Sequence, residues 1–342
     1  MTTDRRTEIV LPGVVAPDGL QVRTSPIPTP GAGQVVIRME ATGVSFAEQQ
    51  MRRGRYYDQP PFPFVPGYDL VGVVQAAGPG TDPVLLGQRV AALTKVGGWA
   101  SHVVVEAADV VPVPAGLDPA EAETVVVNGI TAWQMLHRKA RVRAGQTVLV
   151  HGANGGVGTT LAQLARLAGA QVIGTASPRH HDRLRELGIT PIDYHADVPA
   201  AVRKIAPGGV DAVFDHLGAA SVSGSWRLLA RGGTLVAYGS ASTRDDTGSK
   251  QLPVLRILAR VWTWNALPNG RRGYFYNIWA GRPLAKRRFR ARLRDDLILV
   301  LEAMAQGHLT AQIAARFPLA RAADALRLAE SGTVTGKVIL IP

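Results

Sequence analysis

The most informative segment of the sequence is VLVHGANGGVGTTLAQLARLAGA, residues 148 to 170. An apolar, strand-like run from Thr147 to Val150 leads into Gly152, Gly155 and Gly158, and apolar residues then recur at the spacing of one helix face. Glycines here allow a tight turn and let the backbone approach a pyrophosphate, while the helix N-terminus supplies amide donors to the phosphates. The stretch therefore predicts a strand, turn and helix that bind a dinucleotide.

The end of the next predicted strand, Gln171 to Thr175, indicates which dinucleotide binds. A site for NAD normally has an acidic residue there, which binds the ribose hydroxyls. This chain has Ser177 and Arg179, and its first acid is Asp182. Serine and arginine can donate hydrogen bonds to a 2′-phosphate, which a carboxylate would repel. The sequence predicts NADPH as the cofactor; the alternative interpretation of Arg179 is a surface arginine that opens the next helix.

Two kinds of pattern divide the chain. From Ile9 to about Val125, short strand-like runs separated by Gly and Pro predict a compact, partly closed β-domain. After Asp118, strands alternate with helices, which indicates a parallel sheet wound on both faces. Further helices are expected over residues 252–265 and 290–306, and a last strand over 336–342.

The composition excludes several classes of protein. The 342 residues are 46% hydrophobic and 19% charged, as in a globular protein of two domains. Cysteine is absent, which excludes disulfides, thiolate-bound zinc and cysteine nucleophiles and agrees with a cytoplasmic location. The first residues lack the apolar run of a signal peptide, and no membrane span is expected.

The formal net charge of +12 includes a basic run over residues 282–294. Its cations are Arg282, Lys286, Arg287, Arg288, Arg290, Arg292 and Arg294. Such a run is compatible with a solvated surface segment, an anionic membrane, or an acidic carrier protein with its thioester. No RNA-binding signature accompanies it, so nucleic acid is not expected as a partner.

Several segments together resemble the zinc-independent quinone oxidoreductases of the medium-chain dehydrogenase/reductase superfamily. They are GVSFAEQQMRRGRYY (43–57), PFVPGYDLVGVV (63–74), NGITAWQML (128–136), VLVHGANGGVG (148–158), GGTLVAYGS (232–240) and SGTVTGKVILIP (331–342). NGITAW is similar to vesicle amine transport relatives, and the whole chain to enoyl reductase domains of polyketide and fatty acid synthases. The resemblance implies a GroES-like catalytic domain, a partly closed β-barrel over residues 1–125 and 291–342. A doubly wound Rossmann domain over 126–290 would be inserted into it and bind NADPH.

The resemblance also separates this chain from zinc-dependent relatives. Those enzymes have a metal-binding cysteine and a Gly-His-Glu triplet, whereas the matching triplet here is Gly67, Tyr68 and Asp69. The eight histidines are scattered and cysteine is absent, so no catalytic metal is expected. A mechanism that holds an alkoxide on zinc is excluded with it.

The family's cofactor contacts match positions in several loops. The resemblance places Thr131 near the nicotinamide ribose, and Ser177, Arg179 and Tyr194 around the 2′-phosphate; Tyr194 could equally be a half-buried strand-end residue. The remaining expected contacts are the glycine turn Gly152, Gly155, Gly156, Val157 and Gly158, and the nicotinamide-framing residues Leu217, Gly218, Tyr238, Gly239 and Ser240.

Catalytic residues are expected in the segment 43–57. Ser45 and Glu48 replace an amide and a shorter acid of the family pattern near the expected substrate pocket. Tyr56 matches a family tyrosine, and Tyr57 is an additional aromatic residue. The resemblance leaves Tyr56 as either a proton donor or a wall of the pocket.

These features predict an NADPH-dependent, metal-free oxidoreductase that passes hydride to a quinone or an α,β-unsaturated carbonyl compound. One alternative is an enoyl-thioester or enone reductase of specialised metabolism that meets its carrier at the basic run. Another is a catalytically weak NADPH-binding interaction protein. A homodimer is expected, because family members join Rossmann sheets edge to edge and an apolar, aromatic segment follows LVAYGS.

Overall fold

A computed structural model describes residues 5–219, 221–239, 249 and 251–342. The chain forms two compact units, Met1–Ile130 with Gly281–Pro342, and Thr131–Ala280. The first division, between Ile130 and Thr131, lies after the predicted 125/126 boundary and falls within helix α3 (Val126–Trp133). The second lies before the predicted 290/291 boundary because α9 (Lys286–Ala305) belongs to the first unit as a whole.

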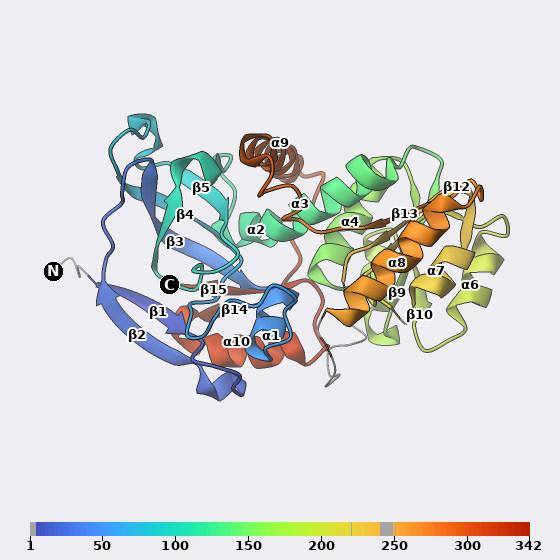
Figure 1. Cartoon of the computed structure of the whole chain (residues 1–342), viewed down its shortest axis with the longest axis horizontal. Coiled ribbons are helices and arrows are strands. Elements are labelled where there is room, and N and C mark those ends of the chain that lie inside the picture. Colours follow the sequence, from blue (N-terminus) through green and yellow to red (C-terminus); the bar gives the residue numbers. More distant parts are fainter. Residues whose placement is uncertain (1–4, 220, 240–248, 250) are drawn as a thin grey trace. The chain divides into compact units, whose positions relative to one another are not determined.

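The first unit is built on strands from both ends of the chain, which pair antiparallel except for β14 with β15 (Figure 1). Its main sheet has the order β14-β15-β3-β4-β5-β7, with β6 paired to β3, and β1 pairs separately with β2. The strands are β1 (Arg5–Val10), β2 (Gln21–Pro26), β3 (Gln34–Val44), β4 (Asp69–Ala77), β5 (Arg89–Leu93), β6 (His102–Glu106), β7 (Val110–Pro112), β14 (Ile313–Pro318) and β15 (Lys337–Ile341). The predicted C-terminal strand therefore returns to the N-terminal β-domain, where β15 pairs with β3.

The core of this unit follows from its apolar strands. Val35, Ile37 and Met39 of β3 are fully buried at alternating positions and face one core cluster, although Val36 between them is buried as well. Leu326 lies on helix α10 (Ala322–Glu330), whose apolar side joins the same cluster and contacts β14 and β15. The other helices of the unit are α1 (Phe46–Arg52), α2 (Pro119–Thr124) and α9.

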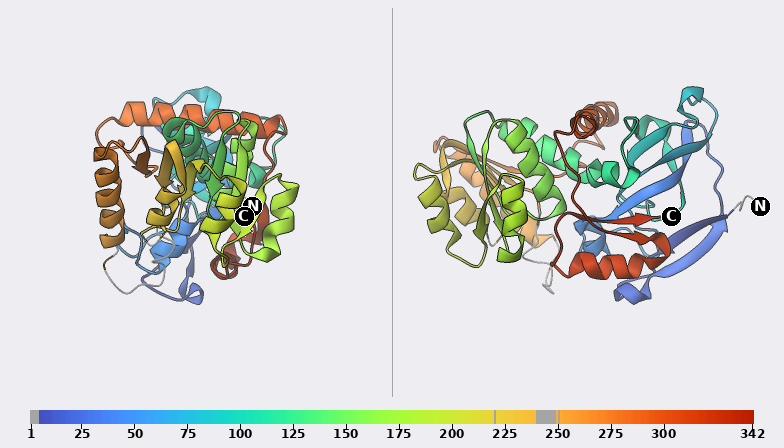
Figure 2. Two further views of the ribbon diagram at one scale, coloured as in Figure 1. Left: turned by 90° about the vertical axis from the view of Figure 1, so that its right-hand side faces the viewer. Right: turned by 180° about the vertical axis from the view of Figure 1, so that it is seen from behind.

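The second unit contains a six-stranded parallel sheet with the order β10-β9-β8-β11-β12-β13. Its strands are β8 (Thr147–Val150), β9 (Gln171–Ala176), β10 (Thr190–Asp193), β11 (Val210–Asp215), β12 (Leu229–Ala237) and β13 (Arg272–Phe275). Its helices are α4 (Gly156–Leu167), α5 (His181–Glu186), α6 (Val198–Ile205), α7 (Val222–Arg227) and α8 (Leu252–Ala266). Opposite views show α4 and α8 on opposite faces of the sheet (Figures 1 and 2), so the predicted doubly wound arrangement is confirmed.

The order of strands reverses between β8 and β11. From β8 the chain moves outward to β9 and β10, then crosses back to β11 on the other side of β8. In doubly wound sheets the loops at such a switch point diverge and leave a crevice at the carboxyl ends of the strands, where ligands bind. The loops that follow β8 and β11 are therefore the first place to look for a site in this unit.

The basic run of residues 282–294 leads into and forms the first half of α9. Arg290 is anchored by a two-point ion pair, with its Nε 2.6 Å from Asp109 Oδ1 and its Nη2 2.8 Å from Asp109 Oδ2. Lys286, Arg287 and Arg288 are exposed. Within the described ranges, no helix is long and apolar enough to cross a membrane.

Candidate active site

The glycine turn between β8 and α4 requires two of its glycines. Gly152 has φ +63°, and a Cβ there would lie 2.3 Å from Cε1 of His216. A Cβ on Gly158 would lie 2.2 Å from the carbonyl oxygen of Gly152. Any side chain at either position would force the turn to move, because real Cβ atoms do not approach so closely.

This turn fits a dinucleotide pyrophosphate. Gly155 is the N-cap of the 12-residue helix α4 and offers no side chain to cap it. The first amides of a helix have no acceptor within the helix and attract anions. Gly156, Val157 and Gly158 occupy this first turn. The predicted pyrophosphate residues thus lie together at the carboxyl end of β8.

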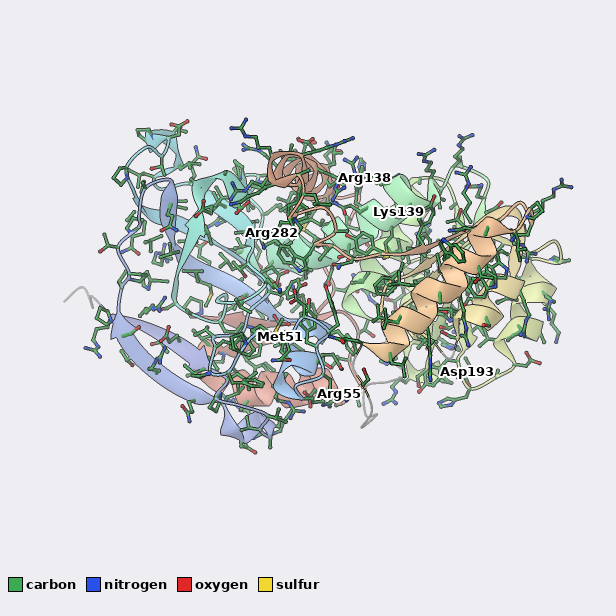
Figure 3. All side chains as sticks on the ribbon, viewed as in Figure 1. Met51, Arg55, Arg138, Lys139, Asp193 and Arg282 are labelled. Carbon is green, nitrogen blue, oxygen red and sulfur yellow. The ribbon has the colours of Figure 1, made fainter. Side chains whose placement is uncertain are left out.

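The predicted 2′-phosphate residues also lie at one edge of the sheet. Arg179 Nε donates to Ser177 Oγ at 3.3 Å, just beyond the end of β9. The backbone amide of Tyr194 donates to the carbonyl oxygen of Ala176 at 3.3 Å, and its side chain is 51% exposed. The nearby acid Asp193, labelled in Figure 3, accepts from the backbone amide of His195 in its own turn.

The predicted nicotinamide residues follow the next two strands. Leu217 and Gly218 come after β11, and Tyr238 and Gly239 after β12. The two loops touch, because a Cβ on Gly239 would lie 2.7 Å from the carbonyl oxygen of His216. Of the other two predicted residues, Thr131 is buried on α3, and Ser240 lies outside the described residues.

His216 was not expected at this site. Burial lowers the pKa of His216 to about 4, so its ring is neutral at physiological pH. Its Nδ1 is buried without a hydrogen-bond partner among the described residues, and its ring packs beneath Gly152. Only its place after an apolar run ending in Asp215 could have indicated it from the sequence.

In the first unit, Ser45 and Glu48 form a capping box at the start of α1. The Ser45 hydroxyl and backbone amide both donate to Glu48 Oε2, the amide at 2.9 Å. Glu48 Oε1 accepts from the backbone amide of Tyr68 at 2.6 Å. Burial raises the pKa of the Glu48 carboxyl. These contacts fix the chain on both sides of the segment that carries Tyr56.

The hydroxyls of Tyr56 and Tyr68 lie 2.8 Å apart. The two rings meet edge to face with centroids 6.4 Å apart, and Tyr57 packs against Tyr56 at 4.7 Å. Tyr56 follows α1, whose buried Met51 is labelled in Figure 3. Burial, followed by the neighbouring Tyr68 and Tyr57, raises the pKa of Tyr56. The Tyr56 hydroxyl is therefore protonated at neutral pH and can act as a donor but not as a base.

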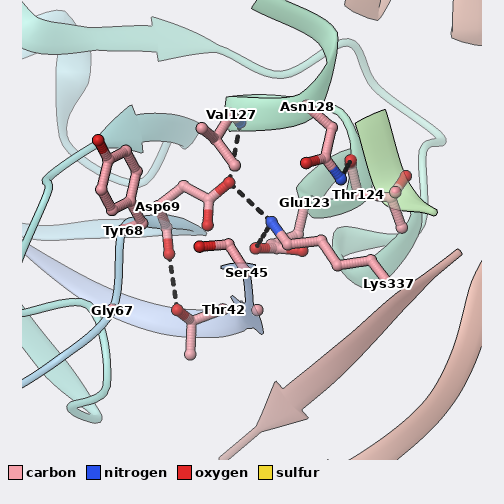
Figure 4. A network of polar contacts seen from close by, with 12 residues as sticks. Thr42, Ser45, Gly67, Tyr68, Asp69, Glu123, Thr124, Val127, Asn128 and Lys337 are labelled. Carbon is pink, nitrogen blue, oxygen red and sulfur yellow. Dashed lines mark hydrogen bonds and ion pairs between the residues drawn. The ribbon is translucent and has the colours of Figure 1, made fainter. Parts of the chain in front are cut away.

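Beside this pair lies a buried ionic cluster (Figure 4). Lys337 Nζ, at the start of β15, is 2.8 Å from Asp69 Oδ2 and 2.7 Å from Glu123 Oε1. The backbone amide of Val127 also donates to Asp69 Oδ2 at 2.8 Å. Gly43 lies against this cluster, since its Cβ would be 2.2 Å from Lys337 Cε. Asp69, at the family's zinc-triplet position, is thus bound by a lysine.

The ammonium group of Lys337 forms ion pairs with two carboxyl groups in this cluster. Burial and then the Asp69 charge raise the pKa of Glu123 well above its usual range. Burial alone would lower the pKa of Lys337, but the charges of Asp69 and Glu123 raise it overall. Lys337 Nζ thus pairs with both carboxyl groups, and Glu123 is the one whose pKa burial raises. Across the described residues, no group of three or more His, Cys, Asp or Glu is placed to hold a metal ion.

Comparisons with known proteins agree with both units. Residues 31–115 match the alcohol dehydrogenase GroES-like domain family, and residues 187–340 match the zinc-binding dehydrogenase family. The human synaptic vesicle membrane protein VAT-1 homolog is 36% identical over 338 residues, which cover 94% of this chain and 82% of that protein. A mycocerosic acid synthase-like polyketide synthase of Mycobacterium tuberculosis is 33% identical over 91% of this chain, which spans 14% of that protein.

Solved structures superpose on this chain over nearly its whole length. A mycobacterial protein, Rv1454c, complexed with NADPH superposes with a TM-score of 0.83 at 28% identity, over 98% of this chain and 100% of that one. A quinone oxidoreductase of Pseudomonas syringae superposes with a TM-score of 0.84 at 27% identity, over the same shares of the two chains.

Fold, glycine turn and comparisons together define a class of protein, the NADPH-binding oxidoreductases with a GroES-like and a Rossmann domain. The chain belongs to the medium-chain dehydrogenase/reductase superfamily, within its quinone oxidoreductase-like branch and close to the VAT-1 homologues. The predicted fold class and cofactor are thereby confirmed.

Proposed function

We propose that this protein passes hydride to a quinone or another α,β-unsaturated carbonyl compound without using a metal. Bound NADPH supplies the hydride. The observation that carries the proposal is the state of Asp69, which is held by Lys337 at 2.8 Å beside Tyr68 where zinc-dependent relatives have two metal ligands. The protein's part is to bind and orient the reactants and to keep water away.

Tyr56 is the proposed proton donor. Reduction of a conjugated acceptor places charge on its oxygen, and the resulting enolate or quinol anion takes a proton from Tyr56 or from water. Tyr68 holds the Tyr56 hydroxyl through their 2.8 Å contact. Ser45 and Glu48 are positioning residues in this proposal, because Glu48 binds the Tyr68 amide and caps the helix that precedes Tyr56.

We expect the purified protein to oxidise NADPH with an ortho-quinone or an activated enone, undiminished by a chelator. Tyr56→Phe should slow enone reduction or loosen its stereochemical control, because an enolate must be protonated on carbon, and should affect quinone reduction little. Initial rates with a panel of quinones, enones and simple alcohols measure this. Metal-dependent oxidation of simple alcohols would overturn the mechanism, and small, equal effects on both acceptors would leave Tyr56 as a wall of the pocket.

Arg179→Ala should weaken NADPH binding by about 10- to 150-fold and leave NADH binding nearly unchanged. The reason is that a charge-assisted hydrogen bond to phosphate contributes about 1.5–3 kcal/mol. Titration of both cofactors measures the change, with Arg185→Ala as control. Arg185 is an exposed arginine on the same helical segment that pairs with Asp182. An equal loss for NADPH and NADH would show that Arg179 acts through general positioning.

A second candidate function is the reduction of enoyl thioesters. It is favoured by the similarity to a polyketide synthase segment and by the exposed cations Lys286, Arg287 and Arg288, which suit an acidic carrier protein. An acyl-carrier enoyl thioester that is reduced faster than any free quinone or enone would favour this function. A protein that binds NADPH but oxidises it with none of these acceptors would be an interaction protein.

The location of the protein in the cytoplasm stays a prediction.

The protein is also proposed to be a homodimer, joined through the second unit. Strand β13 is the last strand of its sheet, and α8, which contacts β13, exposes an apolar stripe. In that stripe Leu255 is 57%, Leu258 43% and Trp262 75% exposed. Leu255→Asp with Leu258→Asp should convert dimer to monomer in light scattering, because two charges would be buried at the interface.

The matched control for the dimer is Leu167→Asp, since Leu167 is 50% exposed on α4, on the opposite face of the sheet. This variant should stay dimeric. A wild-type protein that is monomeric at micromolar concentration would contradict the proposal.

A further inference from the structure

A chain of buried polar side chains crosses the carboxyl ends of three strands in the second unit. Its members are Asp215 at the end of β11, Ser225 on α7, His151 after β8 and Thr175 on β9, each less than one tenth exposed. Ser225 Oγ is 2.7 Å from Asp215 Oδ2, and His151 Nε2 is 3.2 Å from Ser225 Oγ. His151 Nδ1 is 3.3 Å from Thr175 Oγ1, which is 3.1 Å from the amide nitrogen of Gly152.

The chemistry of these groups fixes the direction of every hydrogen bond. Ser225 donates its hydroxyl proton to Asp215 Oδ2, so the Ser225 oxygen accepts from His151 Nε2–H. Burial lowers the pKa of His151, so Nδ1 of the neutral ring is an acceptor and takes the Thr175 hydroxyl proton. The oxygen of Thr175 is then left to accept the amide of Gly152. Because its proton points to Asp215, Ser225 is not a nucleophile.

The same aspartate also holds the neighbouring loop. Asp215 Oδ1 accepts from the backbone amides of Leu217 at 2.9 Å and Gly218 at 3.2 Å, and from Ser221 Oγ at 2.7 Å. Its backbone oxygen accepts from the amide of Tyr238 at 2.9 Å. Through its carboxylate and its backbone oxygen, the buried Asp215 therefore connects the loops after β11 and β12 to the glycine turn after β8, across the point where the strand order reverses.

We propose that Asp215, Ser225, His151 and Thr175 are positioning residues that fix the Gly152 peptide of the glycine turn against the loop Leu217–Gly218, and so set the affinity for the pyrophosphate part of NADPH. The network does not touch the cofactor. It acts by holding the Gly152 amide in a single orientation, and the ring of His216 packs against the same glycine.

The test compares Thr175→Val, which removes the hydroxyl and keeps the shape, with Thr175→Ser, which keeps the hydroxyl. Binding is measured for NADPH and for adenosine 2′-monophosphate, a fragment that lacks the pyrophosphate. Thr175→Val should weaken NADPH by about 5- to 150-fold, as expected when the partly buried Gly152 amide loses its acceptor. The fragment should change by less than about twofold, and Thr175→Ser should restore NADPH binding.

A double-mutant cycle tests whether the residues act as one chain. Ser225→Ala should weaken NADPH in the same direction, and Ser225→Ala with Thr175→Val should lose little more than Thr175→Val alone. This proposal rests on the assignment of NADPH as the cofactor. NADPH binding by the wild-type protein tests that assignment, and the variants then test the network alone. Wild-type affinity in Thr175→Val, equal losses for NADPH and fragment, failure of Thr175→Ser to restore binding, or additive losses would each overturn it.

Discussion

Lys337→Met should lower the free energy of unfolding by about 3–5 kcal/mol, because it leaves the Asp69 carboxylate buried without its counter-ion. Lys337 is 3% and Asp69 0% exposed, so water cannot replace the lost ammonium group. The cluster also joins β15, β4 and α2, which come from both ends of the chain. Chemical denaturation followed by circular dichroism measures the change.

Three further variants make this prediction specific. Lys337→Met with Asp69→Asn should recover much of the loss, since no charge is then left unpaired. Glu123→Gln should cost much less than Lys337→Met, because the Lys337–Asp69 ion pair remains and the variant removes only the carboxyl whose pKa burial raises. Lys286→Met, at an exposed position of α9, should have little effect. A Lys337→Met variant as stable as the wild type would contradict the buried ion pair.

The pH dependence of the free energy of unfolding also tests the buried cluster. A carboxyl whose pKa is raised on folding binds its proton more tightly in the folded state, so its contribution to stability is present below the unfolded pKa and is lost as pH rises through the folded one. Glu123 should therefore make the protein less stable as pH rises above about 4.3. Glu123→Gln should remove that part of the slope.

The sequence predicted the parts of the molecule that local pattern specifies. The glycine spacing with its flanking apolar runs placed β8, the turn and α4, and the apolar run at 252–265 predicted α8 to within one residue. Helix α9 begins four residues before its predicted start, at Lys286, because the apolar period that marks its buried face starts only after the basic residues. Such signals lie within one element, so a single sequence carries them.

The polar clusters could not be predicted, because their members lie far apart in the chain. Lys337 and Asp69 are 268 residues apart, and His151 and Ser225 are 74 apart. The available signal was a polar residue inside or ending an apolar run, as Lys337 in GKVILIP and Asp215 in VDAVFD. That signal marks a buried polar group but not its partner. Likewise, Ser45 and Glu48 were predicted near the substrate, and only the structure shows their capping box.

Gly158→Ala should lower kcat/KM for NADPH by about 100-fold or more. Its Cβ would lie 2.2 Å from the carbonyl oxygen of Gly152 and 2.9 Å from Cα of Ala153, both of them backbone atoms that no rotamer change can move. The turn must shift as a whole, and displacement by about 1 Å of a group that positions a reactant can cost about 100-fold in rate. Steady-state kinetics and direct NADPH titration measure the effect.

Two other glycines show whether the loss comes from this contact. Gly208→Ala lies in the same unit with nothing within 4 Å of its Cβ, so both kinetics and thermal stability should match the wild type. At Gly155 the Cβ would meet only the carbonyl oxygen of Gly152, at an ordinary 3.4 Å, so the free protein should keep its thermal stability. A loss of NADPH affinity in Gly155→Ala would then report the approach of the pyrophosphate itself. If Gly158→Ala bound NADPH as tightly as Gly208→Ala, the turn would not be the phosphate site, and the assignment of the cofactor residues around it would fail.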